Sequence, residues 1–416
     1  MSKVMGVQEV SPGYEFVAEN PAVPEGYKQT EVGVIPEDWE GALLEKVTTA
    51  VASGRSKSNQ AYGSYPVYGS TGVIGYSSEP QYEGTAILVA RVGANAGKLN
   101  KVSGKYGVTD NTIILRFSEA VETGFVWKAL ELKRLNNLVF GSGQPLITGS
   151  QLKALTIAVP PLLEQRAIAT ALSDVDALLE ELDRLIAKKR DIKQAAMQQL
   201  LTGETRLPGF EGKWDSRSLL QIADSQKALF DDGDWVEAEH ITDQGIRLVQ
   251  TGNIGEGVFV DKATKKYIYD ASFEKLRCKE LKQGDILICR LAEPAGRACV
   301  FPDIGENRAI TSVDVTIFRP RPEVADRQYL VQYFSTSDWF KMVLDHVGGT
   351  THKRISRGAL GKLKVPFPPI EEQKAIAEIL SDIDTEIQAL EHRRSKTAEL
   401  KQGMMQELLT GRTRLV

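Results

Sequence analysis

Apolar side chains recur at steps of three and four residues along two stretches of the chain. The positions in this spacing are Ile168, Leu172, Val175, Leu179 and Leu182 in the first stretch, and Ile376, Leu380, Ile383, Ile387 and Leu390 in the second. Such steps align side chains on one narrow face of a helix, which is the seam of a coiled coil. The pattern predicts a long helix over about 164–201 and a second long helix further along the chain.

The two stretches are copies of one element. PPLLEQRAIATALSDVDALLEELD at 160–183 aligns without a gap with PPIEEQKAIAEILSDIDTEIQALE at 368–391, and LLTGETRL at 200–207 aligns with LLTGRTRL at 408–415. Gly203 and Gly411 fit the ends of the two helices, because glycine readily adopts the left-handed conformation that closes a helix. We expect the matched seams to pair as a coiled-coil spacer. Two independent amphipathic helices, each packed on its own domain, are the alternative.

Two non-helical segments, about 40–158 and 214–366, are weakly similar to each other in the order of their motifs. Each contains an apolar strand that ends in Arg and is followed by a turn with Ala-Gly and a basic residue, ILVARVGANAGK at 87–98 and ILICRLAEPAGR at 286–297. Each then reaches a Gly-rich loop and a short strand, LTIAVPP or LKVPFPP. The chain is therefore predicted to alternate between globular segments and helices.

This alternation gives five predicted parts. They are an N-terminal segment over 1–39, a first globular domain over 40–158, a central helix with its linker over 159–213, a second globular domain over 214–366 and a C-terminal helix over 367–416.

Composition places the chain among soluble globular proteins. It has 416 residues, of which 42% are hydrophobic and 25% charged, and its formal net charge is -4. Residues 40–158 hold twelve basic and eight acidic side chains, whereas residues 1–39 hold two and seven. A basic face is therefore expected on the first domain, although the whole chain is slightly acidic.

The cysteines and the hydropathy of the chain indicate a cytoplasmic protein. Cys278, Cys289 and Cys299 form no CxxC pair and cannot pair evenly, so we expect structural thiols in a reducing compartment. No run of about 18 apolar residues predicts a membrane span, and the N-terminal residues do not follow the pattern of a signal peptide.

From GYKQTEVGVIPEDW onward the chain resembles the specificity subunits of type I restriction-modification systems. The resemblance is carried by LPGFEGKW before the second domain, by GDILI, by the GTT…IS…L…VPFPP exit, and by the EQxxIAxxLSxxDxxI…LLTG helix. It implies an α+β protein with two similar α/β target recognition domains, separated by two long helices that form an antiparallel coiled coil with pseudo-two-fold symmetry.

The resemblance also implies a function and a set of partners. Each recognition domain reads one half of a bipartite site on double-stranded DNA, and the divergence of the two domains predicts an asymmetric site. Two methyltransferase subunits and the motor-nuclease subunits are the implied partners. The chain itself is expected to hold no cofactor, with S-adenosylmethionine, ATP and magnesium bound by those partners. A coiled-coil scaffold whose globular domains bind protein is the alternative.

Candidate DNA contacts are basic and amide side chains in the loops of the two domains, because Arg and Lys recognise guanine whereas Asn and Gln recognise adenine. The candidates are Arg55, Lys57, Arg91, Asn95, Lys98 and Gln144 in the first domain, and Arg290, Arg297, His352, Lys353, Arg354 and Arg357 in the second. Solvated surface charge is the alternative for the whole set. Arg91 and Arg290 follow strands that look buried, so structural ion pairs are a further alternative for these two.

The motifs of catalysis are missing. Both Pro-Pro pairs follow Val or Phe and lead into a helix, unlike the Asp- or Asn-Pro-Pro-aromatic loop of an adenine methyltransferase. GANAGKL lacks the spacing and the hydroxyl of a phosphate-binding loop. PDIGENR lacks the spacing of a nuclease site, and the histidines have no metal-ligand spacing. We therefore predict a DNA-recognition protein without catalytic residues and without a metal site.

Overall fold

The computed structural model describes residues 23–57, 63–139, 145–349 and 353–415. Its contacts divide the chain into two compact units, which are Met1–Glu181 together with Arg394–Val416, and Leu182–Arg393. Each unit combines one globular segment with parts of both long helices. The division therefore follows contacts in space and not the order of the chain.

The first unit begins with short strands and ends with the start of a long helix. Its strands are β1 (Tyr27–Thr30), β2 (Gly33–Pro36), β3 (Glu40–Leu43), β4 (Thr48–Ser53), β5 (Tyr65–Gly69), β6 (Gly72–Ser77), β7 (Tyr82–Glu83), β8 (Ala86–Ala90), β9 (Leu99–Val102), β10 (Lys105–Val108), β11 (Thr112–Phe117) and β12 (Thr156–Val159). Its helices before the long one are α1 (Leu44–Val47), α2 (Thr123–Lys133) and α3 (Gly149–Lys153).

The second unit has a similar composition of elements. Its strands are β13 (Asp215–Ser218), β14 (Phe230–Asp232), β15 (Ile241–Thr242), β16 (Ile246–Val249), β17 (Tyr267–Ile268), β18 (Ile286–Cys289), β19 (Ala298–Val300), β20 (Ala309–Thr311), β21 (Val315–Phe318) and β22 (Lys364–Phe367). Its short helices are α5 (Leu219–Ile222), α6 (Asp270–Leu276), α7 (Arg327–Tyr333), α8 (Ser337–Leu344) and α9 (Arg357–Lys362).

Each unit contains two four-stranded sheets, and one of the two has the same strand order in both units. One sheet has the order β4-β11-β8-β9 in the first unit and β14-β21-β18-β19 in the second, with all neighbours antiparallel. The other sheet contains one parallel pair in each unit, β5 with β10 and β16 with β20. The two globular segments are therefore two copies of one α/β fold.

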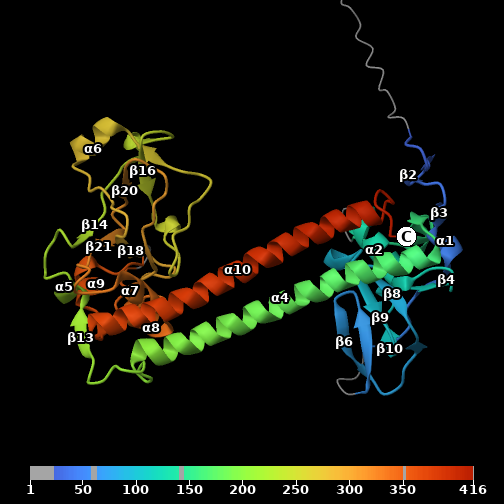
Figure 1. Cartoon of the computed structure of the whole chain (residues 1–416), viewed down its shortest axis with the longest axis horizontal. Helices are drawn as coiled ribbons and strands as arrows, with labels where there is room; N and C mark the ends of the chain where they lie inside the picture. The colour runs from blue at the N-terminus through green and yellow to red at the C-terminus, as the bar shows by residue number, and fades with distance from the viewer. Residues whose placement is uncertain (1–22, 58–62, 140–144, 350–352, 416) are drawn as a thin grey trace, which may run out of the picture. The chain divides into compact units, whose positions relative to one another are not determined.

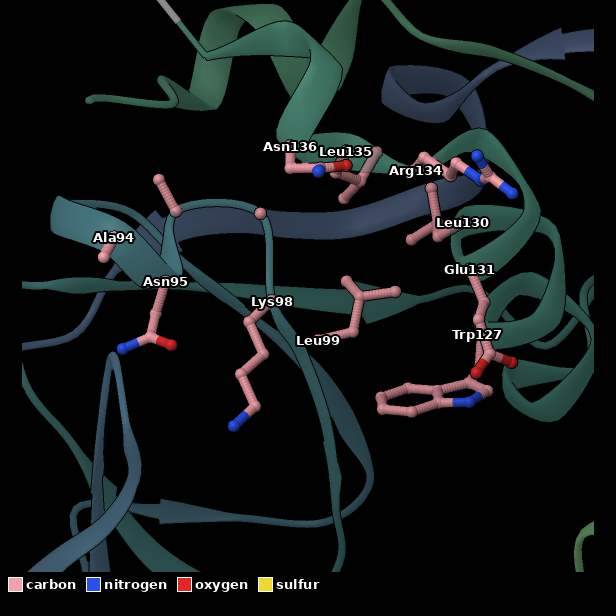
Figure 2. A pocket seen from close by; sticks show the side chains of 12 residues that line it. Ala94, Asn95, Lys98, Leu99, Trp127, Leu130, Glu131, Arg134, Leu135 and Asn136 are labelled. Carbon is pink, nitrogen blue, oxygen red and sulfur yellow. The ribbon is translucent and has the colours of Figure 1, made fainter. Parts of the chain in front are cut away.

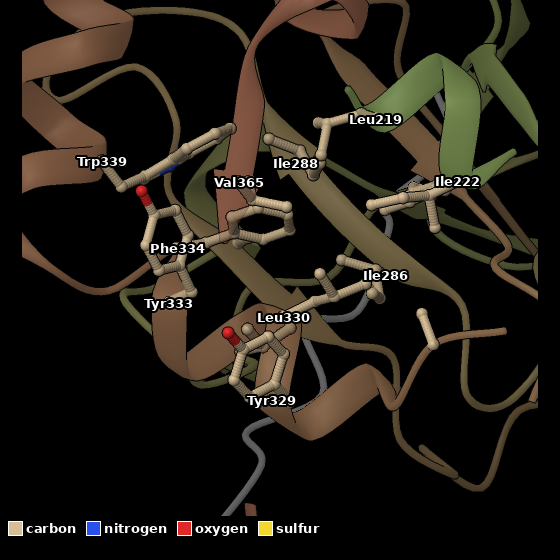
Figure 3. Close-up of a cluster of buried hydrophobic side chains, with 14 of the residues drawn as sticks. Leu219, Ile222, Ile286, Ile288, Tyr329, Leu330, Tyr333, Phe334, Trp339 and Val365 are labelled. Atoms are coloured by element: carbon tan, nitrogen blue, oxygen red, sulfur yellow. The ribbon is translucent and has the colours of Figure 1, made fainter. Parts of the chain in front are cut away.

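Central strands and short helices build the apolar cores. Strands β8 and β18 are buried along their whole length, as an apolar strand between two neighbours and a covering helix must be. In the second unit Trp339, Phe334 and Tyr329 pack against Ile286 and Ile288 of β18 (Figure 3). Burial of these large side chains is the main stabilising contribution to the domain.

The predicted long helices are α4 (Leu162–Thr202) and α10 (Ile370–Leu408), with 41 and 39 residues, and each is an unbroken ribbon in Figure 1. All ten predicted seam positions are buried or half-buried. Within the second unit, Lys193 pairs with Asp384 at 2.7 Å and Lys189 pairs with Glu386. A higher number on α4 thus meets a lower number on α10, so the helices run antiparallel there. The predicted fold class is confirmed.

The start of each long helix is held by the side chain of an equivalent glutamine, Gln165 or Gln373. Gln165 donates to the carbonyl oxygen of Pro160 at 2.8 Å and accepts from the backbone N–H of Glu122, just before α2, at 2.8 Å. Gln373 likewise donates to Pro368 at 2.8 Å and accepts from the backbone N–H of Asp326, just before α7, at 2.9 Å. The repeated glutamine of the sequence therefore fixes the start of each long helix to the globular segment of its unit.

The repeated LLTGxTRL ending has an equivalent role in each unit. In the first unit Arg414, which follows α10, donates Nε and Nη2 to the buried carboxylate of Glu164 at 2.7 and 2.8 Å. The indole of Trp39 donates to the same carboxylate at 3.0 Å. In the second unit Arg206, which follows α4, donates to Glu372 at 2.6 and 2.7 Å, and Trp214 donates to it at 3.0 Å.

These two Trp-Glu-Arg clamps explain why one chain needs the same ending twice. The tail of α10 closes the unit in which α4 begins, and the tail of α4 closes the unit in which α10 begins. A carboxylate with little or no exposure requires such a partner, because an unpaired buried charge is strongly destabilising. The hydrogen bonds that Arg414 donates to Glu164 raise the pKa of its guanidinium, and those that Arg206 donates to Glu372 do the same, so both arginines stay charged.

Candidate DNA interface

The predicted contact residues of the first unit meet at one end of the sheet that contains β4, β11 and β8. The backbone N–H of Gly54, after β4, donates to the carbonyl oxygen of Thr112 at 2.9 Å. The backbone N–H of Arg91, after β8, donates to Asn111 at 2.9 Å, and the N–H of Ile147 donates to Arg91 at 2.9 Å. Three strand ends and the exit of the Gly-rich loop are thereby joined. We call this region the first sheet end.

The second unit joins the equivalent segments with the same backbone bonds. Gly233 donates to Val315 at 2.8 Å, and Arg290 donates to Asp314 at 2.8 Å. The N–H of Ile355 donates to Arg290 at 3.0 Å, as Ile147 does to Arg91 in the first unit. We call this region the second sheet end. The two ends are one backbone frame built twice.

The glycines of this frame are required by its geometry. A Cβ on Gly54 would lie 2.2 Å from the carbonyl oxygen of Val108, and a Cβ on Gly233 would lie 2.3 Å from that of Ser312. Gly97 and Gly296, in the Ala-Gly turns, have φ angles of +90° and +93°, which residues other than glycine rarely adopt. The Ala-Gly repeat seen in the sequence is therefore a backbone requirement of the turn.

The first sheet end presents exposed cations. Arg55 and Lys57 are exposed, and the described residues provide no ion-pair partner for either. Arg91 is half-buried and reaches Ser53 Oγ with Nη1 at 3.5 Å, which is a weak bond. Gln144 lies outside the described residues. The first unit therefore keeps positive charge that is free to meet an anion.

The turn after Arg91 borders an open hollow of about 470 Å³. Asn95 and Lys98 project from the turn, and Trp127 of α2 lies on the opposite side (Figure 2). In the second unit the corresponding turn is closed, because Trp339 Nε1 donates to the carbonyl oxygen of Gly296 at 2.9 Å. The two turns thus share the bond of their closing glycine, from Gly97 to Ala90 and from Gly296 to Cys289, but present different surfaces.

Arg290 has a structural role at the second sheet end. It is 5% exposed, and its Nε lies 3.1 Å from an oxygen of Asp232. Its two Nη atoms donate to the carbonyl oxygens of Ile355 at 3.1 Å and Val313 at 2.5 Å. Both Nη atoms are therefore hydrogen-bonded within the domain and the charge is paired with Asp232, which corresponds to the structural alternative for this residue.

Two of the other cations at the second sheet end are paired with acids. Arg354 Nη1 lies 3.3 Å from Asp314, and Arg357 pairs with Asp231. Arg297 donates to the carbonyl oxygen of Glu293 at 2.6 Å. Lys353 is exposed without a described partner, and His352 lies outside the described residues. Sequence reasoning missed these acids because Asp231 on β14 and Asp314 in the turn before β21 lie far from the basic cluster in the chain.

The equivalent positions of the first unit lack the acids. Strand register and the shared backbone bonds align Asp232 with Ser53 and Asp314 with Asn111. A neutral side chain in the first unit thus stands where a carboxylate stands in the second. The two ends share a frame but differ in charge.

The described residues were compared with the requirements of a metal centre, a membrane span and a reactive thiol. They contain no group of acids, histidines and cysteines that could hold a metal ion, and no described helix is long and apolar enough to cross a membrane. The cysteines of the second unit are buried, and burial raises the pKa of Cys278 to about 11 and of Cys299 to about 12. These two thiols are therefore unreactive near neutral pH, as expected for structural cysteines.

Comparison with known proteins gives concordant matches. The family described as "Type I restriction modification DNA specificity domain" matches residues 36–189 and 212–401. The MjaVIII type I restriction enzyme specificity subunit of Methanocaldococcus jannaschii is 27% identical over 347 residues, which cover 79% of each protein. A putative MjaX specificity subunit of the same archaeon is 27% identical over 428 residues, which cover 94% of this chain and 97% of that protein.

Two solved structures have a similar fold. The type I restriction-modification S subunit of M. genitalium has a TM-score of 0.60 and 16% identity, covering 89% of this chain and 96% of that one. A chain from a structure of type I complex assembly and conformational transition has a TM-score of 0.54 and 17% identity, covering 91% and 99%. At these identities the likeness concerns the fold.

Proposed function

The chain belongs to the type I restriction-modification specificity subunits, and from this premise we propose that it recognises an asymmetric bipartite site on double-stranded DNA. Each recognition domain reads one half of the site through its sheet end. The chain carries no catalysis and directs methylation or restriction by partner subunits. Two methyltransferase subunits and the motor-nuclease subunits are the partners, and they bind S-adenosylmethionine, ATP and magnesium.

One observation supports the asymmetric site above all others. The two sheet ends have the same backbone hydrogen bonds but different side chains, as Ser53 and Asp232 or Asn111 and Asp314 show. A repeated frame places a reader over each half-site, as two related domains on a duplex do. Different side chains on that frame select different bases, because bases are recognised by the donors and acceptors presented to them.

A domain exchange tests this proposal. The chain is produced with its methyltransferase subunits, residues 40–158 are replaced by the first recognition domain of another family member, and genomic methylation is mapped. We expect one half of the methylated motif to change while the other half is kept. The matched exchange of residues 214–366 should change the other half. A motif that changes in both halves, or in neither, contradicts one domain for each half-site.

The paired charges of the second sheet end favour the alternative of a protein-binding scaffold. Asp231 and Asp314 neutralise Arg357 and Arg354, which weakens any attraction to phosphate. Salt dependence separates the two functions. Binding of the assembled complex to a duplex that carries the mapped motif should weaken steeply with salt, because neutralised phosphates release counterions. A scaffold shows no motif-dependent binding at any salt concentration.

A further inference from the structure

Trp235 in the second unit is exposed to an extent unusual for its size. Its side chain is 67% exposed, whereas Trp39 and Trp339 are fully buried. Tryptophan has a large apolar surface, and keeping it in water has a free-energy cost that a binding partner removes. An exposed indole on a domain that binds a ligand is therefore a candidate contact residue.

The backbone on both sides of Trp235 is fixed. The N–H of Asp234 donates to Thr311 at 2.8 Å, and the Asp234 carboxylate accepts from the N–H of Lys279 at 2.7 Å. Val236 packs on the opposite side against the apolar cluster that contains Ile268. Because both neighbours are anchored, the indole is presented outward from a rigid segment and loses little conformational freedom on binding.

The segment lies at the second sheet end. Asp234 forms a parallel bridge with Ser312, which is two residues from Asp314. Asp314 in turn holds Arg354 at 3.3 Å. The shared frame aligns Asp234 with Ser56, whose N–H donates to Val108 at 2.8 Å as that of Asp234 does to Thr311. Trp235 therefore aligns with the next residue, the exposed cation Lys57 of the first sheet end. The indole therefore occupies the place at which the first domain presents positive charge.

The charges around Trp235 decide what kind of contact it makes. Glu237 accepts from the indole N–H at 3.3 Å, and Glu239 is exposed nearby in the chain. Two carboxylates repel phosphate, so the indole is not part of a phosphate-binding surface. Base edges in the grooves present apolar groups such as the thymine methyl, and an exposed carboxylate accepts from the cytosine amine. The indole of Trp235 and the carboxylate of Glu237 therefore fit the base edges of DNA better than its phosphate backbone.

We propose that Trp235 is a specificity-determining DNA contact of the second recognition domain, whose indole packs on base edges without ionic attraction. The inference rests on the proposed function and deepens it. The two domains then divide the binding energy differently. The first relies on free cations such as Arg55 and Lys57, and the second relies on an aromatic contact because Arg354 and Arg357 are already paired.

The test uses the complex of the full chain with its methyltransferase subunits and a duplex that carries the mapped methylation motif. Trp235→Ala should weaken binding roughly 5- to 100-fold with an unchanged salt slope, because no phosphate contact is lost. Trp235→Phe should restore most of the affinity. Tyr269→Ala is the control for the loss of an exposed aromatic side chain from the same domain, since Tyr269 is 52% exposed and follows Ile268, which pairs with Ile246 at the start of β16. It should bind as the unchanged chain does.

Genomic methylation adds a second readout. Trp235→Ala should relax the motif at one or two adjacent positions within a single half-site, while the other half stays intact. Equal melting temperatures of the Trp235 variants show that the fold is retained.

Four outcomes overturn the inference. The first is that Trp235→Ala leaves both affinity and motif unchanged, and the second is that it lowers the salt slope, which assigns a phosphate contact. If it weakens the association of the methyltransferase subunits but not DNA binding by the assembled complex, Trp235 is a protein contact. If the unchanged complex neither binds nor methylates a specific motif, the proposed function fails and the inference fails with it.

Discussion

The first and second sheet ends show which part of a recognition domain is fixed and which part varies. The fixed part is backbone, namely the bonds from Gly54 and Gly233 and the bonds made and accepted by Arg91 and Arg290. These bonds depend little on side-chain identity, apart from the glycines that permit close approach. The variable part is the set of side chains that point away from the frame. A duplicated domain can therefore diverge in recognition without losing its fold.

The charge of the two ends differs for a physical reason that only the assembled sheet reveals. Arg91 and Arg290 occupy equivalent positions, but Arg290 faces Asp232 whereas Arg91 faces Ser53. A carboxylate beside a buried guanidinium compensates the guanidinium for the water that it loses on burial. In the first unit that compensation is missing, and Arg91 stays half-buried. The same sequence motif thus yields a structural arginine in one domain and a partly available one in the other.

The largest predicted effect concerns the two Trp-Glu-Arg clamps. Glu164→Ala and Glu372→Ala should each destabilise their own unit by roughly 2–4 kcal/mol, because each leaves an indole and a guanidinium without the charged acceptor that joins them. Hydrogen exchange measured segment by segment should show loss of protection in 23–181 for the first variant and in 182–393 for the second. Glu371→Ala is the control, since Glu371 is exposed and precedes the clamp residue. Equal loss in both units for either variant contradicts two separate clamps.

The shared frame predicts equal costs at equivalent glycines. Gly54→Ala and Gly233→Ala should each destabilise the chain by roughly 1–3 kcal/mol, because the added Cβ meets backbone carbonyl oxygens that cannot move aside. Thermal unfolding of the two variants measures this. Gly358→Ala should be tolerated, because a Cβ there has no neighbour within 4 Å. A large cost at one glycine and none at its counterpart would show that the two ends are not one frame.

Salt dependence sharpens the comparison of charge. Lys57→Ala should lower the salt slope of duplex binding by about one, because one phosphate contact is lost. Arg354→Ala should change it less, since Asp314 already neutralises Arg354. Asp314→Asn should instead raise the slope, because it frees that arginine. Lys105→Ala is the control, as Lys105 is exposed at the start of β10, away from the first sheet end. Equal slopes for Lys57→Ala and Arg354→Ala would contradict the difference in charge.

The sequence predicts the periodic and duplicated features well. Long helices follow from seam spacing, and the two domains follow from repeated strand and turn motifs, because these signals are local in the chain. The pairing of charges is not local. Arg354 and Asp314 are 40 residues apart, and Arg414 and Glu164 are 250 residues apart. A basic cluster without nearby acids therefore looked free of partners in the sequence, although strands from elsewhere supply them.

The smallest predicted effect is a difference between the two clamps in how the stability of their units depends on pH. Arg414 also donates to Asp38 at 2.9 and 2.7 Å, whereas Arg206 donates instead to the carbonyl oxygens of Glu211 and Gly212. The hydrogen bond from Arg414 lowers the pKa of Asp38 below its ordinary value of 3.8. The folded state therefore binds the proton less readily than the unfolded state. The stability from this pair is complete above the unfolded pKa and is lost as pH falls through the lower, folded pKa.

Because Asp38 is about half exposed, the contribution is below about 1 kcal/mol. Asp38→Asn should remove the corresponding part of the acid dependence of the first unit and leave the second unit unchanged. Hydrogen exchange of residues 23–181 and 182–393, measured between neutral pH and pH 3, separates the two responses. Glu37→Gln is the control, since Glu37 is the neighbouring exposed acid and its carboxylate has no described partner. If Asp38→Asn alters both units equally, the two clamps do not differ in their response to acid, and the asymmetry of the chain is confined to its sheet ends.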